Sequence, residues 1–346
     1  EIVLAAKGPI SVRGGATRHI PNEGTPLTTR GLTGVQLYEP GALTLVARAG
    51  TSVEDIDALL AKHNQRLPFE PMDHRPLLGT TGQPTIGGLI GLNHCGSRRL
   101  QAGAARDLLL GIRMVDGTGR IIKNGGRVMK NVTGYDLARL NCGARATLGI
   151  LTEISLKVLP LPEATISLAL DVTDPERAVR HMAMALGSPY DISGAAWDGD
   201  RVLLRVEGFA ESTRYRADRL VQLLPGATRI AEDPWPAIRD CNRFAGLDTD
   251  VWRVSLRASQ GGLAARALRE KGIAVQLDWG GALLWASAAP GTDLRAMMRD
   301  GYGHATLLRG RPSPRIPKLE PQHAAVANLS ARLRESFDPR GLFRRS

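Results

Sequence analysis

The sequence predicts an α+β protein built from two folded parts, and three observations support this fold class. The chain has 346 residues, which is long for a single domain. Between Pro84 and Pro160, closely spaced glycines alternate with strand-like apolar runs, as in a sheet with tight turns whose backbone passes close to a large ligand. Beyond Pro162 the predicted elements follow the order β-α-β-β-α-β and then repeat it.

The first glycine-rich turn follows a predicted strand at residues 9–13. A strand that ends in such a turn exposes consecutive backbone N–H groups, which can form an anion-binding nest. The arginines on either side carry charge suited to phosphate. A plain turn is the other interpretation, and the segment is no Rossmann fingerprint, because no G-x-G-x-x-G opens a helix here. The residues of the predicted nest are Arg13, Gly14, Gly15, Ala16, Thr17 and Arg18.

Alternating and helical periodicities predict the other elements of the first part. Thr51 and Glu54 form a capping-box pair at the start of a predicted helix over residues 52–63. A short helix is expected to begin at Gly134. The predicted strands cover residues 43–49, 108–115, 120–123 and 149–159, with a hairpin turn at 116–119.

The second part contains the two β-α-β-β-α-β halves, which are expected to join in one antiparallel sheet with helices on one face. The first half has strands at 165–171, 194–197, 201–207 and 228–231, and helices at 174–186 and 212–224. A further helix begins at Asp233. The second half has strands at 251–256, 274–278, 282–287 and 304–308, and helices at 262–271 and 292–299.

Composition narrows the possible functions. The three cysteines form no Cys-x-x-Cys pair and lie near no histidine at zinc spacing, so we expect reduced thiols and no disulfide framework, structural zinc or cysteine-ligated iron. The formal net charge of +11 indicates either a solvated arginine-rich surface or attraction to phosphates, acidic partners or a membrane surface. Aromatic residues are scarce, which argues against nucleic-acid binding. The sequence contains no apolar run of about 18 residues, so we expect no membrane span.

Four motifs together carry a resemblance to a known family: VRGGATR, PTIGGLIG, KNVTGYDLARL and CGARATLGILTEISLKVLP. Over roughly residues 9–162 the chain resembles the FAD-binding domain of the vanillyl-alcohol-oxidase type, also called the PCMH type. The segments GSRR and VMKNVTGYDL and the closing FDPRGLF are similar to the FAD-binding subunits, called E, of bacterial glycolate oxidases. The resemblance implies a PCMH-type domain of two small α+β subdomains plus a ferredoxin-like antiparallel-sheet cap domain.

The resemblance also implies which residues bind FAD. Residues 14–17 would wrap the diphosphate with backbone N–H groups, and residues 84–88 would lie close to the ribityl chain and the flavin ring. The residues near 143–150 would edge the adenosine side or the ring, and Arg98 would add charge. Besides the six residues of the predicted nest, the expected FAD-binding set is Pro84, Thr85, Ile86, Gly87, Gly88, Gly96, Ser97, Arg98, Gly143, Gly149 and Ile150.

Two departures from the family pattern concern backbone conformation. Ala16 and Ala146 stand where the family often has glycine. An alanine at a positive φ angle costs on the order of 1 kcal/mol. We therefore expect weaker FAD binding if either alanine adopts such an angle.

The expected domains are a PCMH-type FAD-binding domain at residues 1–162, a cap domain at 163–310, and a proline-rich connector with a returning terminal helix at 311–346. The cap segment from Gly303 to Arg309 is similar to only part of the family's histidine-rich motif. We therefore expect the side chains of His304 and Arg309 to be structural, and no catalytic residue is assigned.

The sequence thus predicts a cytoplasmic FAD-binding subunit of a multi-subunit glycolate oxidase, with peripheral docking on the inner membrane compatible with its charge. A homologous FAD-containing subunit would oxidise the small 2-hydroxy acid, and an iron–sulfur subunit would pass the electrons on. Two alternatives stay open: a stand-alone FAD-dependent dehydrogenase of the D-lactate type, and a scaffold that has lost FAD.

Overall fold

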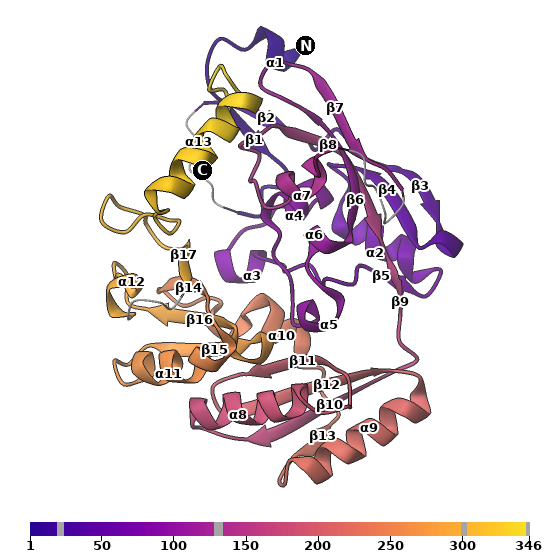
Figure 1. Ribbon diagram of the computed structural model, residues 1–346, viewed down its shortest axis with the longest axis vertical. Coiled ribbons are helices and arrows are strands. Elements are labelled where there is room, and N and C mark those ends of the chain that lie inside the picture. Colours follow the sequence, from indigo (N-terminus) through magenta and orange to yellow (C-terminus); the bar gives the residue numbers. More distant parts are fainter. Residues whose placement is uncertain (19–23, 128–133, 299–302, 344–346) are drawn as a thin grey trace. The chain divides into compact units, whose positions relative to one another are not determined.

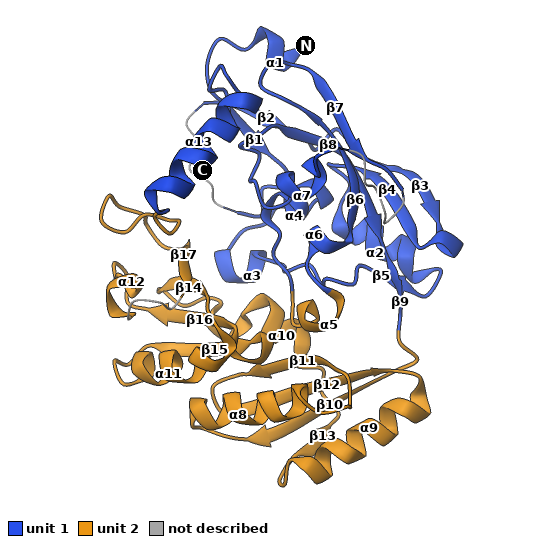
Figure 2. Cartoon of the chain, viewed as in Figure 1, with its two compact units in different colours: residues 1–95, 103–161, 322–346 blue, residues 96–102, 162–321 orange. Residues whose placement is uncertain are grey.

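The computed structural model describes residues 1–18, 24–127, 134–298 and 303–343. The chain divides into two compact units (Figure 2). Unit 1 comprises Glu1–Cys95, Gly103–Leu161 and Gln322–Ser346, and unit 2 comprises Gly96–Ala102 and Pro162–Pro321. Unit 2 therefore includes two segments, 96–102 and 311–321, that the sequence analysis grouped with other domains. The motif residues 128–133 and the last residue of the predicted helix 292–299 lie outside the described residues.

Unit 1 is built around a five-stranded antiparallel sheet (Figure 1). Its strand order is β3 (Val35–Glu39), β4 (Thr44–Arg48), β8 (Ile150–Lys157), β6 (Leu109–Val115) and β7 (Ile121–Gly125). A separate parallel pair joins β1 (Ile10–Arg13) to β2 (Thr25–Thr28), and an antiparallel pair joins β5 (Gln65–Arg66) to β9 (Leu159–Pro160). The predicted strands at 9–13, 43–49, 108–115, 120–123 and 149–159 are confirmed within one or two residues.

The helix α2 (Val53–Ala61) shows how the sequence sets a helix boundary. Ile56 and Leu60 are fully buried on one face, as the helical spacing predicts. The predicted capping pair of Thr51 and Glu54 is wrong, because Ser52 is the N-cap and its hydroxyl accepts the backbone N–H of Asp55 at 3.0 Å. The other helices of unit 1 are α1 (Ile2–Ala5), α3 (Arg75–Leu78), α4 (Ile86–Leu92), α6 (Ala105–Leu108), α7 (Leu137–Asn141) and α13 (Ala324–Phe337).

The C-terminal segment packs into unit 1. The backbone N–H of Ile10 donates to the carbonyl of Leu342 at 2.8 Å, and that of Gly117 donates to the carbonyl of Phe337 at 2.8 Å. Leu342 and Phe343 lie in one apolar cluster with Val3, Ile10 and Ile150. The closing segment thus completes the core around β1.

Unit 2 is an eight-stranded antiparallel sheet in the order β13-β10-β12-β11-β15-β16-β14-β17 (Figure 1). Its first half contains β10 (Ala164–Asp171), α8 (Pro175–Leu186), β11 (Ile192–Trp197), β12 (Arg201–Gly208), α9 (Ala210–Leu223) and β13 (Thr228–Ile230). Its second half contains β14 (Asp250–Ser255), α11 (Ala258–Arg269), β15 (Ala274–Asp278), β16 (Leu283–Ala288), α12 (Leu294–Met297) and β17 (His304–Arg309). The predicted double β-α-β-β-α-β pattern and the single sheet are confirmed.

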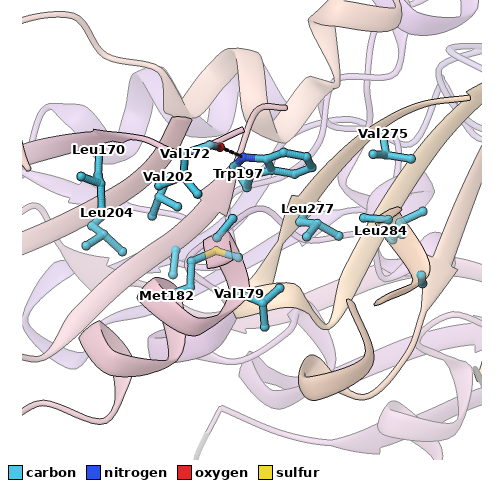
Figure 3. Close-up of a cluster of buried hydrophobic side chains, with 14 of the residues drawn as sticks. Leu170, Val172, Val179, Met182, Trp197, Val202, Leu204, Val275, Leu277 and Leu284 are labelled. Atoms are coloured by element: carbon cyan, nitrogen blue, oxygen red, sulfur yellow. Dashed lines mark hydrogen bonds between the residues drawn. The ribbon is translucent and has the colours of Figure 1, made fainter. Parts of the chain in front are cut away.

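The two halves of unit 2 share one apolar core. Side chains of β10, β11, β12, β15 and β16 meet those of α8 on one face of the sheet (Figure 3). Side chains of α9 and α11 belong to the same apolar cluster. Trp197 lies at the join, where it pairs with Leu277 across β11 and β15, and its Nε1 donates to the carbonyl of Val172 at 2.7 Å. Burying each such large apolar side chain stabilises the fold by roughly 1.5–3 kcal/mol. The opposite face of the sheet carries α10 (Trp235–Asp240), which packs on Ala196 and Leu203.

The remaining helix of unit 2 is α5 (Arg99–Ala102). Within the described ranges, no helix combines the length and the apolar character that crossing a membrane requires.

Candidate functional site

The predicted nest follows β1 as a run of four backbone N–H groups. Among the described residues, none accepts a hydrogen bond from the amides of Gly14, Gly15, Ala16 or Thr17. Gly15 is buried, and buried backbone donors are almost always paired in native structures. Ala16 has φ 57°, so a left-handed residue lies inside the run. Consecutive amides that turn in this way form a concave site for an anion.

Two side chains hold this loop from outside it. The Arg30 guanidinium donates through Nη2 to the carbonyl of Gly15 at 2.9 Å, and the Thr80 hydroxyl donates to the carbonyl of Thr17 at 2.8 Å. Because both bonds use carbonyls, the amides stay available for a ligand. Sequence reasoning missed Arg30 and Thr80, since neither lies in a motif and both are distant along the chain.

Close backbone packing explains the glycines of the nest. A Cβ on Gly15 would overlap the carbonyl of Gln83, and a Cβ on Gly82 would overlap the carbonyl of Gly15. A Cβ on Gly14 would come within 2.8 Å of the Thr85 hydroxyl. The nest therefore lies directly against residues 82–85, the second predicted FAD-binding segment.

The second segment forms the start of α4, not an extended loop. Thr85 is the N-cap, and its hydroxyl accepts the N–H of Gly88 at 3.3 Å. The N–H of Gly87 donates to the carbonyl of Ala49 at 2.8 Å, and the N–H of Ile86 donates to that of Thr51 at 3.0 Å. These amides already have acceptors, and the Ile86 side chain is fully buried.

Pro84 also takes part in this contact. Its carbonyl accepts the N–H of Val53 at 2.9 Å, which joins the segment to the start of α2. Residues 84–88 thus support the nest through packing, and their direct contact with FAD stays a prediction.

The third predicted segment lies at the other end of α4. The N–H of Gly143 donates to the carbonyl of Ile90, and the N–H of Arg145 donates to that of Gly91, both at 2.9 Å. Ala146 has φ 60°, so both alanines that replace family glycines adopt the left-handed conformation. Each costs on the order of 1 kcal/mol relative to glycine. The condition set for Ala16 and Ala146 is therefore met, and the weaker FAD binding expected from it stays a prediction.

Gly149 and Ile150 lie deeper in unit 1. Gly149 has φ 156°, and a Cβ at this position would overlap Met114 and the carbonyl of Val115. The Ile150 side chain is buried in the cluster with Val3 and Ile10. Both residues shape the sheet, and a contact with FAD stays a prediction.

The predicted FAD-binding residues of the 96–102 segment lie in unit 2. The Trp279 indole Nε1 donates to the carbonyl of Gly96 at 3.0 Å, and the Ser97 hydroxyl donates to Asp278 Oδ2 at 2.8 Å. The Arg98 guanidinium donates to Glu207 Oε1. These side chains already have acceptors in unit 2, so no geometry there supports their role as FAD ligands.

A buried cluster of three charges forms around Glu207. Both Arg98 and Arg205 form ion pairs with this carboxylate, and all three side chains are at most 5% exposed. Burial alone would raise the pKa of Glu207, but the charges of Arg205 and Arg98 outweigh it and lower the pKa to about 2. Arg205 also stacks on Trp235, with the guanidinium carbon 4.5 Å from the ring centroid.

β17 carries His304 and Arg309, the two residues that were compared with the family's histidine-rich motif. His304 is exposed at the first position of the strand. The Arg309 guanidinium donates to the carbonyls of Thr249 and Phe244, each at 2.9 Å. Arg309 is thus used to hold a loop of unit 2.

Unit 1 holds a further polar pair, which no motif in the sequence predicts. His74 Nε2 lies 2.9 Å from His94 Nδ1, and both rings are buried. One ring donates and the other accepts, so at most one of them is positively charged.

No group of three or more histidine, cysteine or acidic side chains in the described part of the chain could hold a metal ion. Burial raises the pKa of the Cys142 thiol to about 12, and it also raises the pKa of the Cys241 thiol well above its ordinary value. Neither thiol is therefore poised to be a thiolate nucleophile.

Comparison with known proteins identifies the family. A family described as FAD binding domain matches residues 2–125. The chain is 33% identical over 345 residues to the glycolate oxidase subunit GlcE of Escherichia coli (strain K12), covering 98% of this chain and 92% of that protein. The chain belongs to the GlcE family.

Other relatives match the GlcE-family chain over shorter stretches. The glycolate oxidase subunit GlcD of Bacillus subtilis (strain 168) is 38% identical over 128 residues, which cover 37% of this chain and 26% of GlcD. A D-lactate dehydrogenase of Anaerostipes hadrus is 42% identical over 86 residues, which cover 25% of this chain and 18% of that enzyme.

A solved structure of alkyldihydroxyacetonephosphate synthase superposes with a TM-score of 0.64. It is 17% identical and covers 97% of this chain and 71% of its own, so it supports the fold alone. The PCMH-type fold predicted from sequence is confirmed.

Proposed function

We propose that this chain is the FAD-binding subunit of a multi-subunit glycolate oxidase and that residues 14–17 hold the FAD diphosphate. One observation carries the proposal: four consecutive backbone N–H groups after β1 have no acceptor among the described residues, although two side chains hold the loop. A diphosphate offers several oxygens to such donors and would satisfy them together.

The residues present fit this group. The Arg30 guanidinium, one of whose nitrogens is bonded to the loop, would add positive charge beside the phosphates. Ala16 adopts a left-handed conformation, which sets the direction of its N–H and costs free energy relative to glycine. Bound FAD would supply the two-electron acceptor for oxidation of a 2-hydroxy acid. The role of this chain's own residues is to bind and orient the cofactor.

We further propose that substrate oxidation takes place on a homologous FAD-containing subunit and that an iron–sulfur subunit carries the electrons away. In the complex, glycolate would lose two electrons and two protons to give glyoxylate. The low-pKa carboxylate of Glu207 and the guanidinium of Arg309 are already used in structural contacts, which supports placing the proton transfer elsewhere. The printed name of the E. coli relative describes a subunit and agrees with this assignment.

Two other functions remain as outcomes of the tests. A stand-alone dehydrogenase is favoured by the partial matches to D-lactate dehydrogenases, and a scaffold without FAD would explain the strained alanines. We propose a cytoplasmic location. The net charge of +11 is the one feature that supports docking on an anionic membrane surface.

The nest can be tested with a pair of isosteric variants at Thr17. Thr17→Asp places a carboxylate beside the phosphate site, whereas Thr17→Asn has the same shape and no charge. We expect Thr17→Asp to lower the FAD released per chain by acid at least tenfold and Thr17→Asn to lower it less than threefold. Equal FAD content in both variants would contradict the nest assignment. If the wild-type protein cannot be loaded with FAD, the scaffold without FAD becomes the preferred function.

A second experiment separates subunit from stand-alone enzyme. FAD-loaded chain is mixed anaerobically with glycolate or D-lactate, and flavin absorbance is followed with and without the co-expressed partner subunits. We expect bleaching only in the assembled complex. Bleaching of the isolated chain would establish the stand-alone dehydrogenase instead.

A further inference from the structure

Arg145 is the feature of unit 1 that the proposed function leaves unexplained. It lies between Gly143 and Ala146, in the turn that covers the C-terminal end of α4. Its backbone N–H donates to the carbonyl of Gly91 at 2.9 Å. The turn is closed by Thr147, whose N–H and hydroxyl both donate to the carbonyl of Ala144, at 3.0 and 2.7 Å. The position of residue 145 is therefore fixed by hydrogen bonds on both sides.

The backbone at this position is strained. Arg145 has φ 55° and Ala146 has φ 60°, so two successive residues with side chains adopt the left-handed conformation. Residues other than glycine rarely adopt it, and such strain tends to occur at ligand clamps and functional sites. A glycine would relieve the strain at 145, and the presence of a long cationic side chain needs another explanation.

The Arg145 guanidinium is partly buried and makes no hydrogen bond, ion pair or ring contact with any described residue. Burial lowers its pKa, and no neighbouring carboxylate opposes that effect. The group nevertheless stays charged at neutral pH, because arginine is not deprotonated in proteins. Burying a charge without a partner is costly.

Other poorly exposed arginines of the chain do have acceptors. Arg205 meets Glu207 and Ser193, and Arg295 meets Glu320 at 2.8 Å. Arg216 donates to the carbonyl of Glu207 at 2.6 Å. Arg145 therefore differs from these arginines, because none of the residues that the structure describes accepts a hydrogen bond from its guanidinium.

We propose that Arg145 binds an oxyanion-bearing group held in unit 1, through the parallel N–H donors of its guanidinium. Two groups have this chemistry: a phosphate of FAD and the carboxylate of a 2-hydroxy acid. The inference rests on the proposed function for the presence of these ligands. Its residue lies at the C-terminal end of α4, whereas the nest packs on Thr85 and Gly88 at the N-terminal end.

The test compares Arg145→Gln, Arg145→Gly and the control Arg139→Gln. Arg139 is an exposed arginine of the neighbouring α7, 3.4 Å from Asp136. Each purified full-length chain is freed of FAD and titrated with FAD, and the reloaded chain is titrated with glycolate. Melting temperature is measured for every variant with and without inorganic diphosphate.

A phosphate ligand predicts that both Arg145 variants raise the Kd for FAD at least tenfold. A carboxylate ligand predicts unchanged FAD binding and an at least tenfold higher Kd for glycolate. In either case Arg145→Gly should melt at a higher temperature than Arg145→Gln, because glycine relieves the backbone strain while the ligand contact is lost. A purely structural arginine would not separate stability from affinity in this way.

If both Arg145 variants bind FAD and glycolate as Arg139→Gln does, the inference is overturned. If the wild-type chain binds no FAD at all, the proposed function fails by itself. The inference is then decided by the stabilisation that diphosphate or glycolate gives: loss of that stabilisation in both Arg145 variants supports it, and its retention or its absence from the wild type refutes it.

Discussion

In unit 2 the buried guanidinium groups of Arg98 and Arg205 are both paired with the carboxylate of Glu207. In unit 1, by contrast, no described residue accepts a hydrogen bond from the amides of residues 14–17 or from the guanidinium of Arg145. Both units come from the same chain and both bury polar groups. The difference indicates that the charged cluster of unit 2 is paired within the chain, while unit 1 offers hydrogen-bond donors to a ligand. Each prediction below tests one side of this contrast.

The largest expected effect comes from removing the central carboxylate of unit 2. Glu207→Ala would leave two buried guanidinium groups without their shared partner, and breaking a buried ion pair costs roughly 3–5 kcal/mol. We expect a loss of that size in the free energy of unfolding, measured by urea denaturation. The control is Asp218→Ala, which breaks an exposed pair with Arg229 and should cost less than about 1 kcal/mol. Equal losses would show that the buried cluster is not special.

The same cluster predicts how stability depends on pH. The pKa of Glu207 falls from its ordinary 4.5 to about 2 on folding, so its contribution is present above pH 4.5 and is lost as the pH falls toward 2. The contribution is on the order of 3 kcal/mol. Wild type should lose more stability between pH 5 and 2 than Glu207→Gln does, as measured by thermal unfolding across that range. Parallel curves for the two proteins would be inconsistent with the shifted pKa.

The third prediction concerns the nest in unit 1. Gly15→Ala forces a Cβ against the carbonyl of Gln83, so the loop must move and FAD occupancy should fall at least tenfold. Gly8→Ala is the matched control, because a Cβ there meets no atom within 4 Å. Acid-released FAD per chain is the measurement, and circular dichroism checks that both variants fold. Normal FAD content in Gly15→Ala would mean that the loop is not part of the site.

The smallest expected effect is the relief of strain at Ala16. Ala16→Gly should raise stability by about 0.5–1 kcal/mol and strengthen FAD binding a few-fold, since glycine adopts φ 57° without a steric penalty. The same substitution in a regular helix has the opposite sign: Ala331→Gly in α13 should cost about 1 kcal/mol. Thermal unfolding of the two variants gives the comparison. Destabilisation by Ala16→Gly would contradict the strain.

Local pattern and family resemblance together predicted most of the fold. Alternation identified β4, β6 and β8, and the repeated order of strands and helices identified the sheet of unit 2, because these features depend on neighbours in sequence. The nest was predicted for the same reason, because a strand that runs into Gly14-Gly15 is a local feature, although a plain turn was the other interpretation. The family pattern identified Ala16 and Ala146 as positions where a positive φ would cause strain, and the structure supplied the φ angles.

The contacts that join distant parts of the chain could not be predicted. Ser97 lies 181 residues from Asp278, and Arg98 lies 109 residues from Glu207. No periodicity connects such pairs, so the grouping of residues 96–102 with unit 2 could not be predicted. Arg30 and Thr80 were missed for the same reason. Arg145 stands out only because no described residue accepts a hydrogen bond from its guanidinium. A sequence does not show which side chains meet in the fold.

The interrupted path of the chain has a consequence for its biosynthesis. Unit 1 receives its last buried residues, Leu342 and Phe343, only after the whole of Pro162–Pro321 has been made. At translation speeds of about 5–20 residues per second, this delay is on the order of ten to thirty seconds. During this delay the apolar surface of unit 1 around Ile10 and Ile150 stays uncovered in the growing chain. Unit 2 can already fold before unit 1 is complete.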